Sequence, residues 1–255
     1  MKKTIAIITG ASGGIGSEFV KEMMKENLDE IWVIARNNEK LLALKDKFGE
    51  KIVPISMDLT NISDIKGLEE RLRGNNQRIK YLVNNAGVAR MATYKEFSLE
   101  EIQSTLLLNC GAMVSMSTIC IPHMVKGSVI FNISSASAFQ PLPYLNIYAS
   151  TKAFERNYSR SLNVELKSTG ILSIAVCPSW VDTELLMKEI NGKKVKFDGI
   201  VSANRVVKLA IKDAKAGKDM SVCSAYVKWM HVLIKLTPQK ITMNVWMRKI
   251  GKYLK

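Results

Sequence analysis

Short apolar runs alternate along this chain with longer segments of helical periodicity, and this alternation restricts its fold more than any other feature. Apolar runs of this kind indicate strands that are buried on both faces of a sheet. They predict strands at residues 4–9, 31–35, 52–57, 81–84, 128–134 and 172–177, and a weaker one at 220–223. The segments between them predict helices at residues 14–25, 39–48, 63–72, 99–119, 147–168 and 203–214.

This order of strands and helices predicts an α/β fold with a parallel sheet, because consecutive parallel strands are joined by helix-sized crossovers. Right-handed crossovers place helices on both faces, and ligands bind beyond the carboxyl ends of the strands, where the strand order reverses. With 255 residues and 47% hydrophobic content, the chain is sufficient for one globular domain. We assign residues 1–224 to this domain and residues 225–255 to a helical extension.

A glycine-rich segment follows the first predicted strand and leads directly into a helix. In dinucleotide-binding folds, glycines at this place allow a tight turn and let the backbone approach a pyrophosphate, whose charge the start of the helix favours. A plain strand-to-helix turn can carry the same residues, so the segment needs support from elsewhere in the chain. The residues expected to contact a cofactor here are Gly10, Ser12, Gly13, Gly14, Ile15 and Gly16.

The end of the second predicted strand carries Arg36 where many dinucleotide-binding folds carry a carboxylate. A carboxylate there binds the hydroxyl groups of the adenosine ribose, whereas a guanidinium can pair with a 2′-phosphate through charge-assisted hydrogen bonds. Arg36 therefore predicts NADP(H) as the cofactor. The alternative is that Arg36 is a solvated charge at the start of the next helix.

Two further strand ends carry residues suited to cofactor contact. Asp58 could accept a hydrogen bond from the adenine amine, with Leu59 offering backbone or apolar contact, although capping of the next helix is nearly as good an interpretation. The fourth strand ends in Asn85, Ala86 and Gly87, whose small side chains suit close approach by a cofactor, although turns of this kind are common.

Tyr148 and Lys152 are four residues apart in a predicted helix, so both side chains lie on one face. A cation within about 4–6 Å favours a phenolate by about 1–3 pKa units, which would make Tyr148 a proton donor near neutral pH. This pair alone is a common accident of sequence. Ser135, at the end of a buried strand, adds a hydroxyl at the edge where a parallel sheet presents its site.

Together, the glycine-rich segment, residues 84–87, Asn109, Ser135, Tyr148 and Lys152 resemble the short-chain dehydrogenase/reductase family. The resemblance extends over about residues 4–183 and implies a Rossmann-type, doubly wound sheet of seven strands in a single domain. It also implies that Ser135 orients a substrate carbonyl and that Tyr148 transfers the proton. Lys152 would lower the pKa of Tyr148 and hold the nicotinamide ribose, and Asn109 would fix a water in the proton relay.

The resemblance continues into residues 178–183. Pro178, Val181 and Thr183 correspond to the family's segment beside the nicotinamide, where Val181 and Thr183 would contact the carboxamide. The family usually has glycine after the proline, and this chain has Ser179, which alters the local backbone without removing the chemistry. Leu185, Leu186 and Met187, which follow, either line the substrate pocket or serve as ordinary packing residues.

The implied function is hydride transfer between NADP(H) and a ketone, aldehyde or alcohol, with Tyr148 as the acid or base. Within enzymes, the alternatives are a hydroxysteroid dehydrogenase, a 3-oxoacyl reductase and a general carbonyl reductase acting on a small substrate. From another class, the alternative is a non-catalytic NADP(H)-binding sensor. The complete set of Asn109, Ser135, Tyr148 and Lys152 argues against the sensor.

The last 36 residues contain seven Lys or Arg and no Asp or Glu, and they supply half of the net charge of +14. Apolar and aromatic side chains recur there at helical spacing, from Tyr226 to Ile234 and again after Pro238. Basic amphipathic helices with tryptophan can lie on an anionic membrane surface, which would suit a lipophilic substrate. The alternative is that these helices pack on the domain or on a neighbouring subunit.

Several function classes are not favoured by the sequence. Nothing accompanies the basic charge that resembles a nucleic-acid-binding module, and two histidines make a histidine-rich metal centre improbable, so we assign neither. Four widely spaced cysteines favour a reducing cytoplasm. The apolar start is too short for a signal peptide, and the apolar segment at residues 102–125 is expected to be a buried helix rather than a membrane span. The family resemblance implies a homodimer or homotetramer paired through the long helices.

Overall fold

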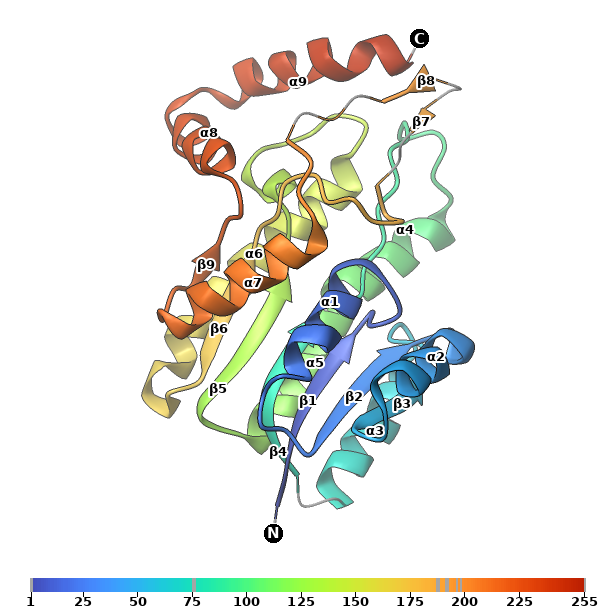
Figure 1. Ribbon diagram of the computed structural model, residues 1–255. Helices are drawn as coiled ribbons and strands as arrows, with labels where there is room; N and C mark the ends of the chain where they lie inside the picture. The colour runs from blue at the N-terminus through green and yellow to red at the C-terminus, as the bar shows by residue number, and fades with distance from the viewer. Residues whose placement is uncertain are drawn as a thin grey trace.

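The computed structural model of the protein describes residues 2–74, 77–186, 189–190, 193–195, 197 and 199–254 (Figure 1). Its centre is a parallel sheet of seven strands in the order β3-β2-β1-β4-β5-β6-β9. The strands are β1 (Lys3–Thr9), β2 (Glu30–Ala35), β3 (Ile52–Ser56), β4 (Gln77–Asn84), β5 (Met124–Ile133), β6 (Leu172–Val176) and β9 (Met220–Ser221). The predicted doubly wound fold of seven strands is confirmed.

Helices cover both faces of the sheet, and each face has its own apolar core. One core packs α1 (Gly14–Met23), α2 (Asn38–Phe48) and α7 (Ala203–Lys215) through residues such as Phe19, Leu41 and Val207. The other packs α3 (Ile62–Gly74), α5 (Ala112–Cys120) and α6 (Asn146–Glu165) through residues such as Leu68, Met116 and Leu162. Strand side chains alternate between the two cores, as a strand's period of two residues requires.

The helix predicted at residues 99–119 is interrupted by a π-helical turn. It consists of α4 (Leu99–Leu106), the π turn η1 (Leu107–Gly111), α5 and a last 3₁₀ turn η2 (Ile121–His123). The whole run Leu99–His123 is long and apolar enough to cross a membrane by length and composition. Its α5 part is nevertheless packed into the core against the sheet, as the sequence predicts for a buried helix.

The strand order reverses beside β1, which pairs with β2 on one side and with β4 on the other. This is the place where open parallel sheets bind ligands, because the crossovers leave in opposite directions and open a crevice. The carboxyl ends of β1 and β4 are joined there by the side chain of Thr9, whose Oγ1 donates to the carbonyl of Val83 at 3.2 Å.

The C-terminal segment forms two helices, α8 (Ala225–Leu236) and α9 (Gln239–Leu254). Figure 1 shows both beyond the carboxyl ends of the strands, at the opposite end of the molecule from the N-terminus. Val227 of α8 packs with Phe139 of the 3₁₀ turn η3 (Ala136–Phe139). A short antiparallel pair, β7 (Glu189–Ile190) and β8 (Lys193–Lys194), precedes them and was not predicted.

Candidate active site

A cleft of about 1170 Å³ lies over the carboxyl ends of the strands, and most of the predicted site residues line it. Two do not, namely Gly16 and Asn109. The predicted residues in its lining are Gly10, Ser12, Gly13, Gly14, Ile15, Arg36, Asp58, Leu59, Asn85, Ala86, Gly87, Ser135, Tyr148, Lys152, Pro178, Val181 and Thr183. The cleft therefore joins motifs that are up to about 170 residues apart in the chain.

The glycine-rich segment turns sharply between β1 and α1. Gly10 and Gly14 have φ of +61° and +54°, values that a side chain strains. A Cβ atom on Gly16 would lie 2.2 Å from the carbonyl oxygen of Gly10, so this glycine keeps the turn tight from beneath the cleft. No side chain caps α1 at Gly13, and the first-turn amides of a helix lack partners within the helix.

Asn85 fixes the glycine-rich segment to the end of β4. Its Nδ2 donates to the carbonyls of Thr9 at 3.2 Å and Gly10 at 2.9 Å. The backbone amides of Asn85 and Ala86 both donate to the Thr9 hydroxyl, at 2.9 and 3.1 Å. Asn85 lines the cleft as predicted, but its side-chain amide nitrogen bonds to the backbone of the glycine-rich segment.

Arg36 and Asp58 lie in the lining of the cleft at the ends of β2 and β3. The Asp58 carboxylate accepts hydrogen bonds from the backbone amide and the hydroxyl of Thr60, at 2.9 and 2.7 Å, and these bonds lower its pKa, with Arg36 contributing. The helix-capping alternative for Asp58 does not hold, because the side chain of Asn61 accepts from the amide of Ser63 at the start of α3. Arg36 is exposed and precedes Asn37, which caps α2.

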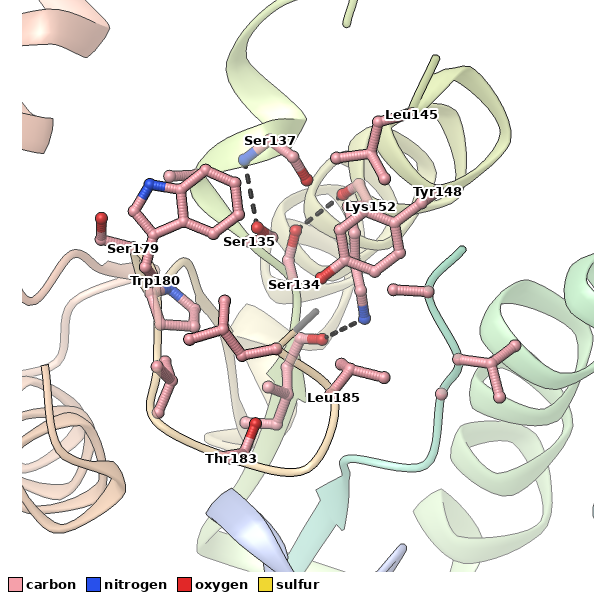
Figure 2. Close-up of a pocket in the computed structure, with 18 of the residues that line it drawn as sticks. Ser134, Ser135, Ser137, Leu145, Tyr148, Lys152, Ser179, Trp180, Thr183 and Leu185 are labelled. Atoms are coloured by element: carbon pink, nitrogen blue, oxygen red, sulfur yellow. Dashed lines mark hydrogen bonds between the residues drawn. The ribbon is translucent and has the colours of Figure 1, made fainter. Parts of the chain in front are cut away.

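Ser135, Tyr148 and Lys152 lie together in the cleft (Figure 2). Ser135 lies two residues after the end of β5, and its Oγ accepts a hydrogen bond from the amide of Ser137 at 3.1 Å. The Nζ of Lys152 lies 5.6 Å from the centre of the Tyr148 ring, within the range expected from their spacing on one helix face. The end of β5 thus places a hydroxyl beside a phenol and an ammonium carried by α6.

Burial raises the pKa of Tyr148, and Lys152 and the Ser135 hydroxyl act in the opposite direction. The effect of Lys152 is the one expected from the sequence, but it is not the dominant one. The carboxylate of Glu155 also raises the pKa of Tyr148, and this partly cancels the lowering by Lys152.

Glu155 was missed by the sequence analysis. Its side chain is buried, and both carboxylate oxygens accept from the Nζ of Lys152 at 2.9 Å. Burial is the largest single effect on the pKa of Lys152 and lowers it, but the charge and hydrogen bonds of Glu155 act together with Tyr148 and Cys110 in the opposite direction, so the net pKa is raised. A signal was present in the sequence, since a residue three positions after Lys152 shares its helix face.

Asn109 lies behind the cleft, in the π-helical turn η1, with 1% of its surface exposed. Its Oδ1 accepts from the amide of Val88 at 2.9 Å, and its Nδ2 donates to the Val88 carbonyl and the Thr151 hydroxyl, both at 3.0 Å. Gly87 separates it from Lys152, since a Cβ atom at Gly87 would lie 3.1 Å from Oδ1 of Asn109 and 3.6 Å from Nζ of Lys152. Asn109 thus fixes the chain just beyond β4 to α6.

Beyond Tyr148 the cleft is lined by apolar and aromatic side chains. Trp180 packs on Phe197 and on Trp246 of α9, with ring centres 4.6 and 6.4 Å apart. The Nε1 of Trp246 donates to the carbonyl of Pro143 at 2.9 Å, which ties α9 to the loop before α6. Leu185 and Leu186 also line the cleft, whereas Met187 lies outside the described residues.

Residues 4–194 match the family model described as short chain dehydrogenase. Very-long-chain 3-oxoacyl-CoA reductase-B of Danio rerio is 35% identical over 192 aligned positions that cover 71% of this chain and 60% of that protein. 17-beta-hydroxysteroid dehydrogenase type 3 of Rattus norvegicus is 28% identical over 263 aligned positions that cover 98% of this chain and 83% of that protein. This chain thus spans less than two thirds of the fish relative's length.

The fold is also that of a solved short-chain dehydrogenase from Sphingobium yanoikuyae in complex with NADPH. The two chains are 27% identical and superpose with a TM-score of 0.78 over 90% of this chain and 92% of the other. The matched family model covers the sheet except for its edge strand β9, together with the glycine-rich segment and the residues around Tyr148. The chain belongs to the short-chain dehydrogenase family of oxidoreductases.

Proposed function

We propose that the protein interconverts a ketone or aldehyde and an alcohol by hydride transfer with NADP(H). The observation that carries this proposal is the convergence of Ser135, Tyr148 and Lys152 in a cleft whose other end is the glycine-rich turn. A polar, proton-exchanging group at one end and an anion-favouring helix start at the other suit a nicotinamide and a pyrophosphate, respectively.

The cleft fits a phosphorylated dinucleotide. Gly10, Gly13 and Gly14 bring backbone rather than side chains to the lining, where the first turn of α1 would favour the pyrophosphate. Arg36 presents an exposed guanidinium at the end of β2, where it would pair with the 2′-phosphate. The NADPH complex of the Sphingobium relative supports the same cofactor.

When bound, the nicotinamide supplies or accepts the hydride. Ser135 donates a hydrogen bond to the substrate oxygen and orients it, while the Tyr148 hydroxyl gives that oxygen its proton in reduction and takes it back in oxidation. Lys152 holds the nicotinamide ribose. Its positive charge also favours the phenolate of Tyr148, because it acts to lower the pKa of that hydroxyl. Asn109 holds the chain around Lys152 and supports a water in the relay.

Turnover of NADPH by the purified protein, across steroid ketones, 3-oxoacyl thioesters, sugars and small aldehydes, tests this function. Tyr148→Phe should lower the rate by about 10²–10⁴-fold, because it removes the proton donor and leaves the ring. NADPH binding by this variant, followed by fluorescence, should persist. NADPH binding without turnover of any substrate would instead establish the non-catalytic sensor.

We propose further that the substrate is lipophilic. The cleft beyond Tyr148 is closed by Leu142 and Leu145 on one side and by α8 and α9 on the other, with Met230, Leu233 and Trp246 in its lining. An apolar lining of this kind favours long or bulky apolar substrates over small polar ones. The names of the fish and rat relatives point in the same direction. A kcat/KM that does not rise with chain length in a 3-oxo series would favour the small-substrate alternative.

The outer face of α8 and α9 is the surface through which we propose contact with an anionic membrane. Tyr226, Trp229, Val232 and Leu236 of α8 are 57–80% exposed and recur every three or four residues, so they form one apolar stripe. Tyr226, together with Ile241 and Val245 of α9, also lines the cleft, so the stripe borders its mouth. With seven basic and no acidic residues among the last 36 of the chain, the surface complements anionic lipid.

Sedimentation with vesicles tests this membrane contact. The parent protein should pellet with vesicles of phosphatidylcholine and phosphatidylglycerol, and less with phosphatidylcholine alone. The double variant Trp229→Glu, Leu236→Glu should stay in the supernatant, whereas Tyr94→Glu, which changes an equally exposed aromatic residue outside this segment, should still pellet. If the double variant pellets like the parent, or if it changes the oligomeric mass instead, this surface does not bind lipid.

We propose a cytoplasmic homo-oligomer, with the membrane contact as a peripheral one. All four cysteines are free thiols, which suits a reducing compartment. Leu99, Leu106 and Leu107 around α4, and Phe154 and Val164 of α6, are exposed apolar residues that would be covered by pairing of the long helices. The molar mass in solution, measured by light scattering for the parent and for Val164→Glu, tests the pairing.

A further inference from the structure

A second buried ionisable group lies directly behind Lys152. The side chains of Lys152 and Glu155 are 6% and 3% exposed, and they form an ion pair on the inner face of α6. Both carboxylate oxygens of Glu155 are 2.9 Å from the Nζ of Lys152. Such burial is costly for each charge unless the partner compensates it, so the two side chains depend on one another.

The Nζ of Lys152 makes three hydrogen bonds with other groups of the protein. An ammonium has three N–H donors. The Nζ of Lys152 donates to the carbonyl oxygen of Ile133 at 2.8 Å and to the two oxygens of Glu155. Lys152 must therefore give up one of these partners before it can donate to a ribose hydroxyl in the cleft.

The charge of Glu155 also acts on Tyr148, since it raises the pKa that Lys152 lowers. The other titratable groups that interact with Glu155 are the thiols of Cys110, from η1, and Cys177, after β6. Burial raises the pKa of these thiols to about 11 and about 12, so both are neutral at physiological pH. Of these groups, only Lys152 and Glu155 therefore carry a charge beside Tyr148 at physiological pH.

We propose that Glu155 is a positioning residue that holds the Lys152 ammonium against the end of β5 and offsets its charge, thereby setting the pH range in which Tyr148 exchanges its proton. This inference rests on the function proposed for Tyr148 and Lys152. Ionised Glu155 leaves the pair neutral and Lys152 fully bonded. Protonated Glu155 frees a donor of Lys152 and leaves one positive charge beside the phenol.

Glu155 changes its charge near physiological pH. Burial raises its pKa to about 7, against the opposing effect of Lys152. A modest change of pH or the arrival of a cofactor can therefore shift Glu155 between its two charge states. Loss of its charge favours the phenolate of Tyr148, because the positive charge of Lys152 is then uncompensated.

The pH profile of alcohol oxidation tests the inference, because Tyr148 acts there as the base. In Glu155→Gln, which keeps an acceptor oxygen but removes the charge, the rising limb should lie about one pH unit lower than in the parent. Glu155→Asp, which keeps the charge, should retain most of the parent profile. Glu165→Gln removes an exposed carboxylate from the end of the same helix and should leave the profile unchanged.

A folded Glu155→Gln protein whose profile coincides with that of the parent overturns the inference. NMR of protein labelled with ¹³C at the tyrosine ring gives a second measurement that needs no turnover, with Tyr148 assigned through Tyr148→Phe. In the parent, the Tyr148 signal should move near pH 7, when Glu155 ionises, and again at its own ionisation. A signal without the first step overturns the inference even if Glu155→Gln does not fold. An inactive parent with both steps would contradict only the proposed reaction.

Discussion

Arg36 is the side chain on which the choice of cofactor depends. It is exposed in the lining of the cleft and close enough to Asp58 to lower the pKa of that carboxyl. Charge-assisted pairing with a 2′-phosphate is worth about 1.5–3 kcal/mol, and an aspartate there would repel the phosphate. In Arg36→Asp, the ratio of kcat/KM for NADPH to that for NADH should fall by about 100-fold. An unchanged ratio would contradict the assignment of Arg36, and Lys51→Asp, which reverses an exposed charge outside the cleft, is the control.

Two glycines of the same turn should respond very differently to substitution. A Cβ atom at Gly16 would lie 2.2 Å from the carbonyl oxygen of Gly10, whereas one at Gly13 would meet nothing within 4 Å. Gly16→Ala forces the backbone to move and should cost about 2 kcal/mol or more of unfolding free energy. Gly13→Ala should change it by less than about 0.5 kcal/mol. Equal losses in urea denaturation would show that the turn adapts more freely than its packing indicates.

The residues of the site differ in how far the sequence could identify them. Tyr148, Lys152 and Ser135 could be predicted because helix spacing and strand ends fix their neighbourhood. Glu155 is on the same helix face by its spacing, but an exposed Glu and a buried one look identical in a sequence. Only the packing of α6 against η1 and β6 shows that its charge faces Lys152.

At the scale of elements, strand interiors could be predicted and strand ends could not. β4 begins at Gln77 and β5 at Met124, earlier than their apolar runs, because the backbone also pairs Ile79 with Met124, which lie in the core but next to polar residues such as Lys80 and Lys126. Pairing there needs only backbone groups, so polar side chains do not reveal it. The π turn at Leu107–Gly111 is equally invisible to periodicity, because it adds a local irregularity within a continuous helix.

A buried polar cluster joins the elements that carry the site. The Nδ2 of Asn132 on β5 donates to the hydroxyls of Ser159 and Ser173, at 3.0 and 3.1 Å, and its Oδ1 accepts from Asn84 at 2.8 Å. This cluster links β4, β5, β6 and α6 in the interior of the protein.

Asn132→Ala removes hydrogen-bond partners from three buried side chains at once. Each buried group left unpaired costs about 1–3 kcal/mol, so the unfolding free energy should fall by about 3 kcal/mol. Asn157→Ala, which changes an exposed asparagine of α6, should cost less than about 0.5 kcal/mol. A loss at Asn132 no larger than this, measured by urea denaturation, would mean that water replaces the missing amide.

At the scale of the whole molecule, a net charge of +14 surrounds a cleft proposed to bind an anionic cofactor. The basic residues in the lining are Arg36, Lys40, Lys152 and Lys249, against the acidic Asp58 and Glu184. A field of one sign focused at a cleft accelerates the association of an oppositely charged ligand by about 10–10³-fold, and salt screens it. The rate of cofactor association should therefore depend on ionic strength more strongly than the rate of dissociation.

In stopped-flow fluorescence, the association rate constant of NADPH should fall by about tenfold between about 0.02 M and about 0.5 M ionic strength. NADH lacks the 2′-phosphate and should show a weaker dependence. Lys249→Gln, which removes an exposed charge from the lining, should reduce the salt dependence, whereas Lys51→Gln, outside the lining, should alter it less. An association rate that is independent of salt would mean that the charge of the molecule is too widely spread to act on the cofactor, and that binding depends on the local contacts of Arg36 and the glycine-rich segment.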